Sequence, residues 1–145
     1  YFDKYSIQIL ASDASTNVIN RAKSGLYKDR SFRNIPEDIK NKYFTKIDFQ
    51  WKIDTEIHNK VDWFIKNLKN QNEFSFLYSS DIILCRNVFI YFSDEAIKEI
   101  VNTFYDKMPQ LAYLFVGISE SLLKLKTRFE LIEKNNTFLY IKNEQ

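Results

Sequence analysis

The pattern of apolar and polar positions along the first third of this chain of 145 residues predicts a strand followed by two helices. The segment "SIQILASD" (6–13) has the apolar run of a buried strand and ends in polar residues. The segment "TNVINRAKS" (16–24) has apolar residues at helical spacing, and Gly25 suits the position after the last turn. A short helix is expected over "PEDIKNKYF" (36–44), with proline at its start and acids in its first turn.

The middle of the chain shows a different periodicity. Ile47, Phe49, Trp51 and Ile53 alternate strictly with polar residues, which predicts one half-buried antiparallel strand. The segment "VDWFIKNL" (61–68) predicts a further strand.

The second half returns to long apolar runs. Segments 81–87 and 111–119 predict strands that are buried on both faces. Between them, 94–108 is a clear amphipathic helix that Ser93 can cap. The last segment, 129–143, predicts two strands joined at "KNN". Buried strands that alternate with helices indicate a doubly wound α/β sheet.

Composition narrows the class of protein. An apolar fraction of 45% and an aromatic fraction of 17% are ample for a core. A net charge of +2 gives no argument for nucleic acid or an anionic membrane as a partner. Cys85 is the only cysteine, so the chain has neither an internal disulfide nor a cysteine metal cluster, and a reducing cytoplasm is expected.

Polar residues follow the predicted strands where a ligand would lie. Ligands of doubly wound sheets bind beyond the carboxyl ends of the strands. Asp13 follows "ILAS", Asn67 follows "WFIK", and Arg86 with Asn87 follows "IILC". The segment "GISES" (117–121) is a further candidate.

Six segments resemble one family in their order and spacing: "ILASDAS", "AKSGLY", "NKYF", "KNL", "DIILCRNVFIYF" and "LFVGISES". They are similar to the chemotaxis receptor methyltransferases of the CheR type, and "CRNVFIYF" is highly specific to that family. The resemblance implies one partial methyltransferase domain over 1–145 with a Rossmann-like α/β sheet. It also implies a small antiparallel β insert over 45–65 and a C-terminal β-hairpin.

The resemblance further implies an activity, a cofactor and a partner. Such enzymes transfer methyl groups from S-adenosylmethionine to glutamate side chains in the cytoplasmic domains of chemoreceptors, and reach the membrane only through the receptor. Asp13 would accept hydrogen bonds from the ribose hydroxyls of the cofactor. Asn67 and Leu68 would flank the adenine. Arg86 and Asn87 would lie around the methionine moiety.

The chemistry implied by the resemblance needs positioning groups rather than a proton-transfer pair. A glutamate side chain has a pKa of about 4.3, so the acceptor is already a carboxylate near neutral pH. Arg86 can orient that carboxylate through paired N–H donors, and Tyr91 can place a hydroxyl near the methyl group. The only histidine, His58, is expected to be a solvated loop residue.

Each of these residues also has a plain structural interpretation. Asp13 or Ser15 can cap the helix over 16–24, and without the resemblance Asp13 would be read first as such a cap. Arg86 could form a structural ion pair, and Asn87 could serve only to turn the chain. Tyr91 could be a core residue with a satisfied hydroxyl. Cys85 is expected to be a small buried hydrophobic residue.

Two features depart from the family pattern. Ile118 stands in "GISES" where the family usually has a histidine. The first strand and glycine-containing cofactor loop of the family, upstream of "ILASD", are not in these 145 residues, nor is the helical N-terminal domain. We therefore expect a piece of a longer protein, incomplete as an enzyme, whose open strand edges favour homo-oligomers. Two alternatives stay open: a non-catalytic module that docks on a receptor or signalling partner, and a methyltransferase for another acceptor.

Overall fold

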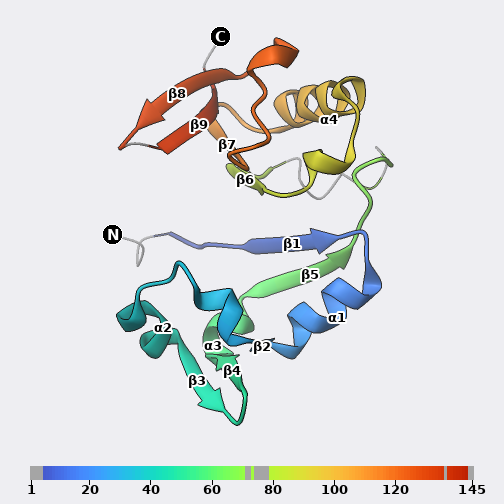
Figure 1. The fold of residues 1–145 in the computed structure, drawn as a ribbon. Coiled ribbons are helices and arrows are strands. Elements are labelled where there is room, and N and C mark those ends of the chain that lie inside the picture. Colours follow the sequence, from blue (N-terminus) through green and yellow to red (C-terminus); the bar gives the residue numbers. More distant parts are fainter. Residues whose placement is uncertain (1–4, 71–72, 74–78, 136, 144–145) are drawn as a thin grey trace. The chain divides into compact units, whose positions relative to one another are not determined.

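The computed structural model describes residues 5–70, 73, 79–135 and 137–143. It divides into two compact units, Tyr1–Asn67 and Leu68–Gln145 (Figure 1). The first unit holds a two-stranded parallel sheet and a three-stranded antiparallel sheet, and the second holds a four-stranded sheet. This mixture of helices with parallel and antiparallel strands confirms the predicted α/β class.

The parallel sheet of the first unit pairs two strands from opposite ends of that unit. β1 (Ile9–Asp13) lies beside β5 (Val61–Ile65), and α1 (Thr16–Ser24) packs against both. The helix is confirmed: the Ser15 side chain accepts a hydrogen bond from its first turn, and Gly25 ends it in the left-handed conformation. β1 is shorter and more exposed than the buried strand predicted for 6–13, because β5 is its only partner among the described residues.

The antiparallel sheet has the order β2-β4-β3. Its strands are β2 (Leu26–Tyr27), β3 (Phe44–Ile47) and β4 (Gln50–Ile53). The helical elements around it are η2 (Asp29–Phe32), α2 (Glu37–Tyr43) and α3 (Thr55–His58). The sheet therefore covers residues 26–53, whereas 61–65 belongs to the parallel pair. These ranges differ from the 45–65 expected for the antiparallel insert.

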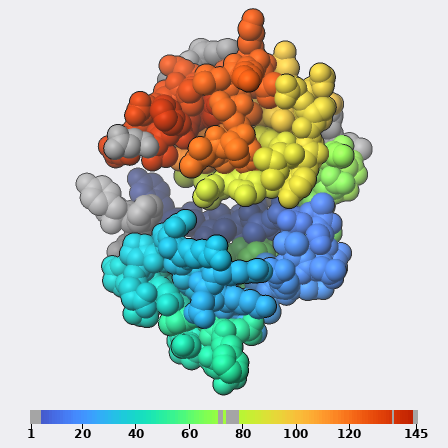
Figure 2. Space-filling model, in the orientation of Figure 1, coloured from blue at the N-terminus to red at the C-terminus, as the bar shows by residue number. Residues whose placement is uncertain are grey.

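The single strand predicted across Ile47–Ile53 is wrong. Residues 48 and 49 form a turn between β3 and β4, in which Asp48 has a φ of 51° and Phe49 is 91% exposed. A two-residue turn keeps the parity of the alternation, so the pattern continues through the hairpin without a visible break. Figure 2 shows this hairpin protruding at the bottom of the first unit.

Gly25 occupies a position that a side chain would strain. Its φ is +63°, and a Cβ atom there would lie 3.0 Å from Ile53 Cγ2 and 3.4 Å from the His58 ring. Gly25→Ala is therefore expected to lower the free energy of unfolding of the first unit by about 1–2 kcal/mol. Urea unfolding followed by tryptophan fluorescence measures this, because both tryptophans, Trp51 and Trp63, lie in that unit.

The control for this substitution is Lys23→Ala, two residues earlier on the exposed side of α1. Its effect is expected to stay within about 0.5 kcal/mol. Equal unfolding curves for Gly25→Ala and the unsubstituted protein would contradict the role given to this glycine.

The sheet of the second unit has the order β6-β7-β9-β8. Its strands are β6 (Ile82–Cys85), β7 (Ala112–Val116), β8 (Glu130–Lys134) and β9 (Thr137–Lys142). β6 and β7 are parallel, and β9 is antiparallel to both β7 and β8, which confirms the predicted terminal hairpin. The helical elements are η4 (Phe89–Tyr91), α4 (Asp94–Lys107) and η5 (Leu123–Leu125).

Helix α4 supplies more residues to the core of the second unit than any other element. Ser93 caps it, with its hydroxyl accepting the Ala96 N–H at 3.3 Å. The predicted apolar stripe is buried against β7, where Leu114 has no exposed surface. The core residues of the stripe are Ile97, Ile100, Val101 and Phe104. None of the described helices has the length and apolar character needed to cross a membrane.

Strand β6 is not buried on both faces as predicted. Ile83 and Cys85 lie in the core, whereas Ile82 is 58% and Leu84 72% exposed. Within the described residues β6 pairs only with β7 and packs its inward face on the core that α4 completes. The strand therefore has one buried face, one exposed apolar face and one open edge without a partner among the described residues of its own unit.

Candidate functional site

Asp13 lies at the carboxyl end of the parallel pair in the first unit. It pairs with Ile65 in the register, and its carbonyl oxygen accepts the Lys66 N–H at 3.0 Å. Asn67 follows two residues beyond this pair, so the parallel register brings the ends of both strands to one edge. This is the edge at which doubly wound sheets bind ligands.

The carboxylate of Asp13 is only partly used by the fold. Its Oδ1 accepts the Ser15 N–H at 2.7 Å, which closes a tight turn between β1 and α1. The cap of the helix is Ser15, so the interpretation of Asp13 as the helix cap is wrong. Oδ2 has no hydrogen-bond partner among the described residues and can accept from a ligand.

The segment after β6 presents the other predicted side chains. Arg86 and Asn87 are exposed, and Asn87 has a φ of 61°, a left-handed conformation that asparagine tolerates better than most residues. Tyr91, in η4, is 75% exposed, so it is not a core residue. The Arg86 guanidinium forms no ion pair with any described residue, which leaves it available to an anion.

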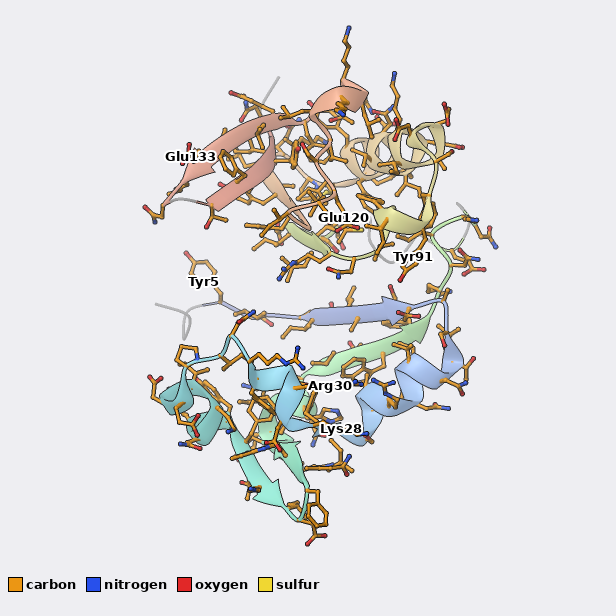
Figure 3. All side chains as sticks on the ribbon, in the orientation of Figure 1. Tyr5, Lys28, Arg30, Tyr91, Glu120 and Glu133 are labelled. Atoms are coloured by element: carbon orange, nitrogen blue, oxygen red, sulfur yellow. The ribbon has the colours of Figure 1, made fainter. Side chains whose placement is uncertain are left out.

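This segment is held by a buried carboxylate from the loop after β7. Glu120 is 6% exposed, and its two oxygens accept hydrogen bonds from four backbone N–H groups. Oε2 accepts from Asn87 at 2.6 Å and from Gly117 at 2.9 Å. Oε1 accepts from Val88 and from Phe89, each at 2.7 Å. Figure 3 labels Glu120 together with Tyr91 in the second unit.

The environment of Glu120 keeps it charged. Burial alone would raise the pKa of its carboxyl group, but the hydrogen bonds from the four backbone N–H groups outweigh burial and lower that pKa below its ordinary value. The carboxylate is therefore ionised at neutral pH. No described basic side chain forms an ion pair with it, so backbone dipoles alone compensate the charge.

Gly117 makes room for this carboxylate. A Cβ atom at this position would overlap Oε2 of Glu120 and lie 3.1 Å from its carboxyl carbon. The side chain of Glu120 thus folds back over the end of β7, where only a glycine leaves the space. Gly117 and Glu120 act as one unit that fastens the segment after β6.

Cys85 ends β6 immediately before this segment. Its side chain is 5% exposed, which confirms the expected small buried residue. Burial, together with the negative charge of Glu120, raises the pKa of the thiol to about 12. The thiol is therefore neutral and unreactive in the folded chain.

A measurement of thiol reactivity checks this environment. Iodoacetamide at pH 8 is expected to alkylate Cys85 in the folded protein on the order of a hundredfold more slowly than in the denatured protein. The denatured sample is the control, because Cys85 is the single thiol in both. Similar rates in the two samples would show that the thiol is accessible or ionised.

The predicted site residues fall into two sets. Asp13 and Asn67 belong to the first unit, whereas Arg86, Asn87 and Tyr91 share one segment of the second. Leu68 begins the second unit and packs, partly buried, against its core.

Two residues have roles that the sequence did not predict. His58 is half-buried, with Nε2 3.0 Å from the carbonyl oxygen of Ala22, so it is not a solvated loop residue. Glu120 lies in the candidate segment 117–121, but the sequence did not single it out as the residue that fastens the segment carrying Arg86, Asn87 and Tyr91. The available signal was a glycine three residues before an acid, directly after a buried strand.

The sequence of the chain matches one protein family and several relatives. The chain matches the family described as "CheR methyltransferase, SAM binding domain" over residues 1–138. It is 34% identical over 128 residues to chemotaxis protein methyltransferase 2 of Vibrio cholerae, covering 88% of this chain and 44% of that protein. It is also 34% identical over 121 residues to the chemotaxis protein methyltransferase of Borreliella burgdorferi, covering 81% of this chain and 42% of the relative.

A third relative is the chemotaxis protein methyltransferase of Escherichia coli, 30% identical over 128 residues, with 86% of this chain and 44% of the relative covered. The chain thus spans somewhat less than half the length of these relatives.

Proposed function

Because the chain belongs to the CheR methyltransferase family through its S-adenosylmethionine-binding domain, we propose that the protein methylates glutamate side chains of chemoreceptors. The observation that carries the proposal is the exposed segment from Arg86 to Tyr91, fastened at the carboxyl end of a parallel strand. The names of the relatives support a methyltransferase that acts in chemotaxis.

The residues at the strand ends suit the cofactor. Asp13 offers a carboxylate oxygen without a partner among the described residues, which fits the hydroxyl donors of a ribose. Asn67 and Leu68 are proposed to flank the adenine, and Asn87 to contact the methionine moiety. When bound, S-adenosylmethionine supplies an electrophilic methyl group on a positively charged sulfur.

The acceptor side of the reaction needs orientation rather than a base. A glutamate side chain is ionised at neutral pH, since its ordinary pKa is about 4.3. Arg86 is proposed to hold that carboxylate through paired N–H donors, and Tyr91 to place its hydroxyl beside the transferring methyl group. The second unit supplies both groups on one short segment, which suits a reaction that depends on positioning.

The antiparallel sheet of the first unit is proposed as the docking surface for the receptor. Phe49 is almost fully exposed, and Ile47 and Leu26 are also exposed beside it. These three residues, from β2, β3 and the turn between β3 and β4, line a shallow hollow, and β2 and β3 are the edge strands of the sheet. Exposed apolar side chains next to unpaired strand edges favour an extended receptor segment that adds to the sheet.

The charges around this hollow balance. Lys28 and Arg30, labelled in Figure 3, are accompanied by Asp29 and Asp48. The proposed contact with the receptor segment is therefore mainly apolar. Phe49→Ala is expected to weaken the binding of a receptor peptide at least tenfold in a fluorescence titration, without changing the affinity for S-adenosylhomocysteine. An unchanged peptide affinity would reject this surface.

The first test of the catalytic proposal is calorimetric titration of S-adenosylhomocysteine, the product form of the cofactor. It is added to these 145 residues and to the full-length protein. Binding to the full-length protein, followed by transfer of labelled methyl groups to receptor glutamates, would support the proposal. Absence of binding to either would favour the docking module, and binding without methylation of a receptor would favour another acceptor.

A further inference from the structure

We propose that Glu120 is a positioning residue that fixes the segment carrying Arg86, Asn87 and Tyr91 in its binding conformation. This inference rests on the proposed methyltransferase function. Glu120 is buried and charged, and it has no role in the methyl transfer proposed for Arg86 and Tyr91.

Four backbone N–H donors surround the carboxylate of Glu120. The N–H groups of Asn87, Val88 and Phe89 are successive along the chain and converge on Glu120 from one side. Gly117, the first residue after β7, donates the fourth hydrogen bond from the same loop as Glu120. Successive N–H groups in a left-handed turn form a concave anion site, and here the anion is a side chain of the protein itself.

The four donors require a carboxylate at position 120. Each oxygen of Glu120 accepts two N–H groups, so all four partners are donors. A glutamine of the same shape would turn its NH2 group toward two of these donors, whichever way its amide is oriented. Glu120→Gln therefore removes two hydrogen bonds and opposes donors to donors, although the volume hardly changes.

The carboxylate of Glu120 supports the backbone that carries the exposed side chains of Arg86, Asn87 and Tyr91. Asn87 adopts a left-handed conformation, which needs support from its surroundings. The hydrogen bonds from residues 87–89 tie the chain between Arg86 and Tyr91 to the end of β7. The other titratable group coupled to Glu120 is Cys85, whose thiol is neutral. Without the carboxylate the exposed segment loses its common anchor.

The test compares two substitutions that reach the same contact from opposite sides. Glu120→Gln alters the acceptor, and Gly117→Ala displaces it by filling its space. Each is expected to weaken binding of S-adenosylhomocysteine to the full-length protein at least tenfold. The double variant should lose little more than either single variant, because both remove one interaction.

The matched control is Val101→Ala, a fully buried position of α4. It destabilises the same unit but removes none of the hydrogen bonds to the segment after β6, and its affinity for S-adenosylhomocysteine should stay within about twofold of the unsubstituted protein. Unchanged affinity in Glu120→Gln or Gly117→Ala would overturn the inference, as would equal losses in Val101→Ala.

A second readout does not depend on the cofactor. The amide proton resonances of Asn87, Val88, Phe89 and Gly117 are expected to shift together, with one midpoint, as the carboxyl group protonates in acid. The joint shift should be absent in Glu120→Gln. Four independent or unshifted resonances would overturn the inference even if the variants fail to fold. If the protein binds no S-adenosylhomocysteine but the joint shift is present, the proposed function fails and the positioning of the segment by Glu120 stands.

Discussion

Replacement of Asp13 by alanine is expected to weaken binding of S-adenosylhomocysteine to the full-length protein about a hundredfold. The substitution removes the carboxylate oxygen that is proposed to accept from the ribose. Hydrogen bonds to a charged group contribute roughly 1.5–3 kcal/mol each, and about 1.4 kcal/mol corresponds to a factor of ten in affinity. Isothermal calorimetry measures the loss.

The control for Asp13 lies two residues away. Ser15→Ala removes the cap of α1 and the stabilisation of about 1 kcal/mol that such a cap provides, yet leaves the carboxylate in place. Its affinity for S-adenosylhomocysteine should stay within about threefold of the original. Similar losses in both variants would mean that Asp13 acts only through the turn between β1 and α1.

Replacement of Arg86 by lysine is expected to lower kcat for methyl transfer about a hundredfold. Lysine keeps the charge but cannot present paired, coplanar donors to a carboxylate, and small errors in the position of a reacting group reduce rates by about this factor. Binding of S-adenosylhomocysteine should change less than kcat does. Steady-state transfer of labelled methyl groups to a receptor fragment provides the measurement.

Arg128→Lys is the matched control for Arg86→Lys. Arg128 lies in the same unit, forms an ion pair with Asp106 at 2.5 Å and stands over the ring of Tyr105. Its replacement keeps the charge and leaves the segment after β6 untouched, so kcat should be nearly unchanged. If both variants transferred methyl groups at the original rate, Arg86 would have no part in orienting the acceptor.

The elements with a single strong periodicity were predictable from the sequence. Helix α4 is the clearest case, because its apolar stripe and the Ser93 cap agree, and the stripe is buried as expected. The β3–β4 hairpin was not predictable from alternation. Asp48 and Phe49 turn the chain without changing which residues alternate, so two short strands have the pattern of one.

The burial of strands was predicted less well than their existence. The apolar run of β6 favoured burial on both faces, but Leu84 is exposed in the structure. An apolar run shows which faces of a strand are suited to burial. Whether those faces are buried depends on the strands and helices that pack beside them. Within the described residues β6 has a neighbour only on the β7 side.

The exposed members of the candidate site were predictable because polar residues after apolar strands stand out. Arg86 and Asn87 are of this kind, and both are exposed at the end of β6. Glu120 was not predictable in this way, since an acid in a loop is usually solvated. Its role depends on three N–H groups that lie 31 to 33 residues earlier in the chain. Such a contact is visible only in three dimensions.

The buried state of Cys85 makes this protein convenient for site-specific labelling. A cysteine placed at Phe49, on the exposed tip of the β3–β4 hairpin, would be the single fast-reacting thiol. An environment-sensitive fluorophore attached there would report the arrival of a receptor segment directly, without prior removal of the native cysteine. The same low reactivity should protect the protein from oxidative inactivation during purification, so that reducing agents are not required.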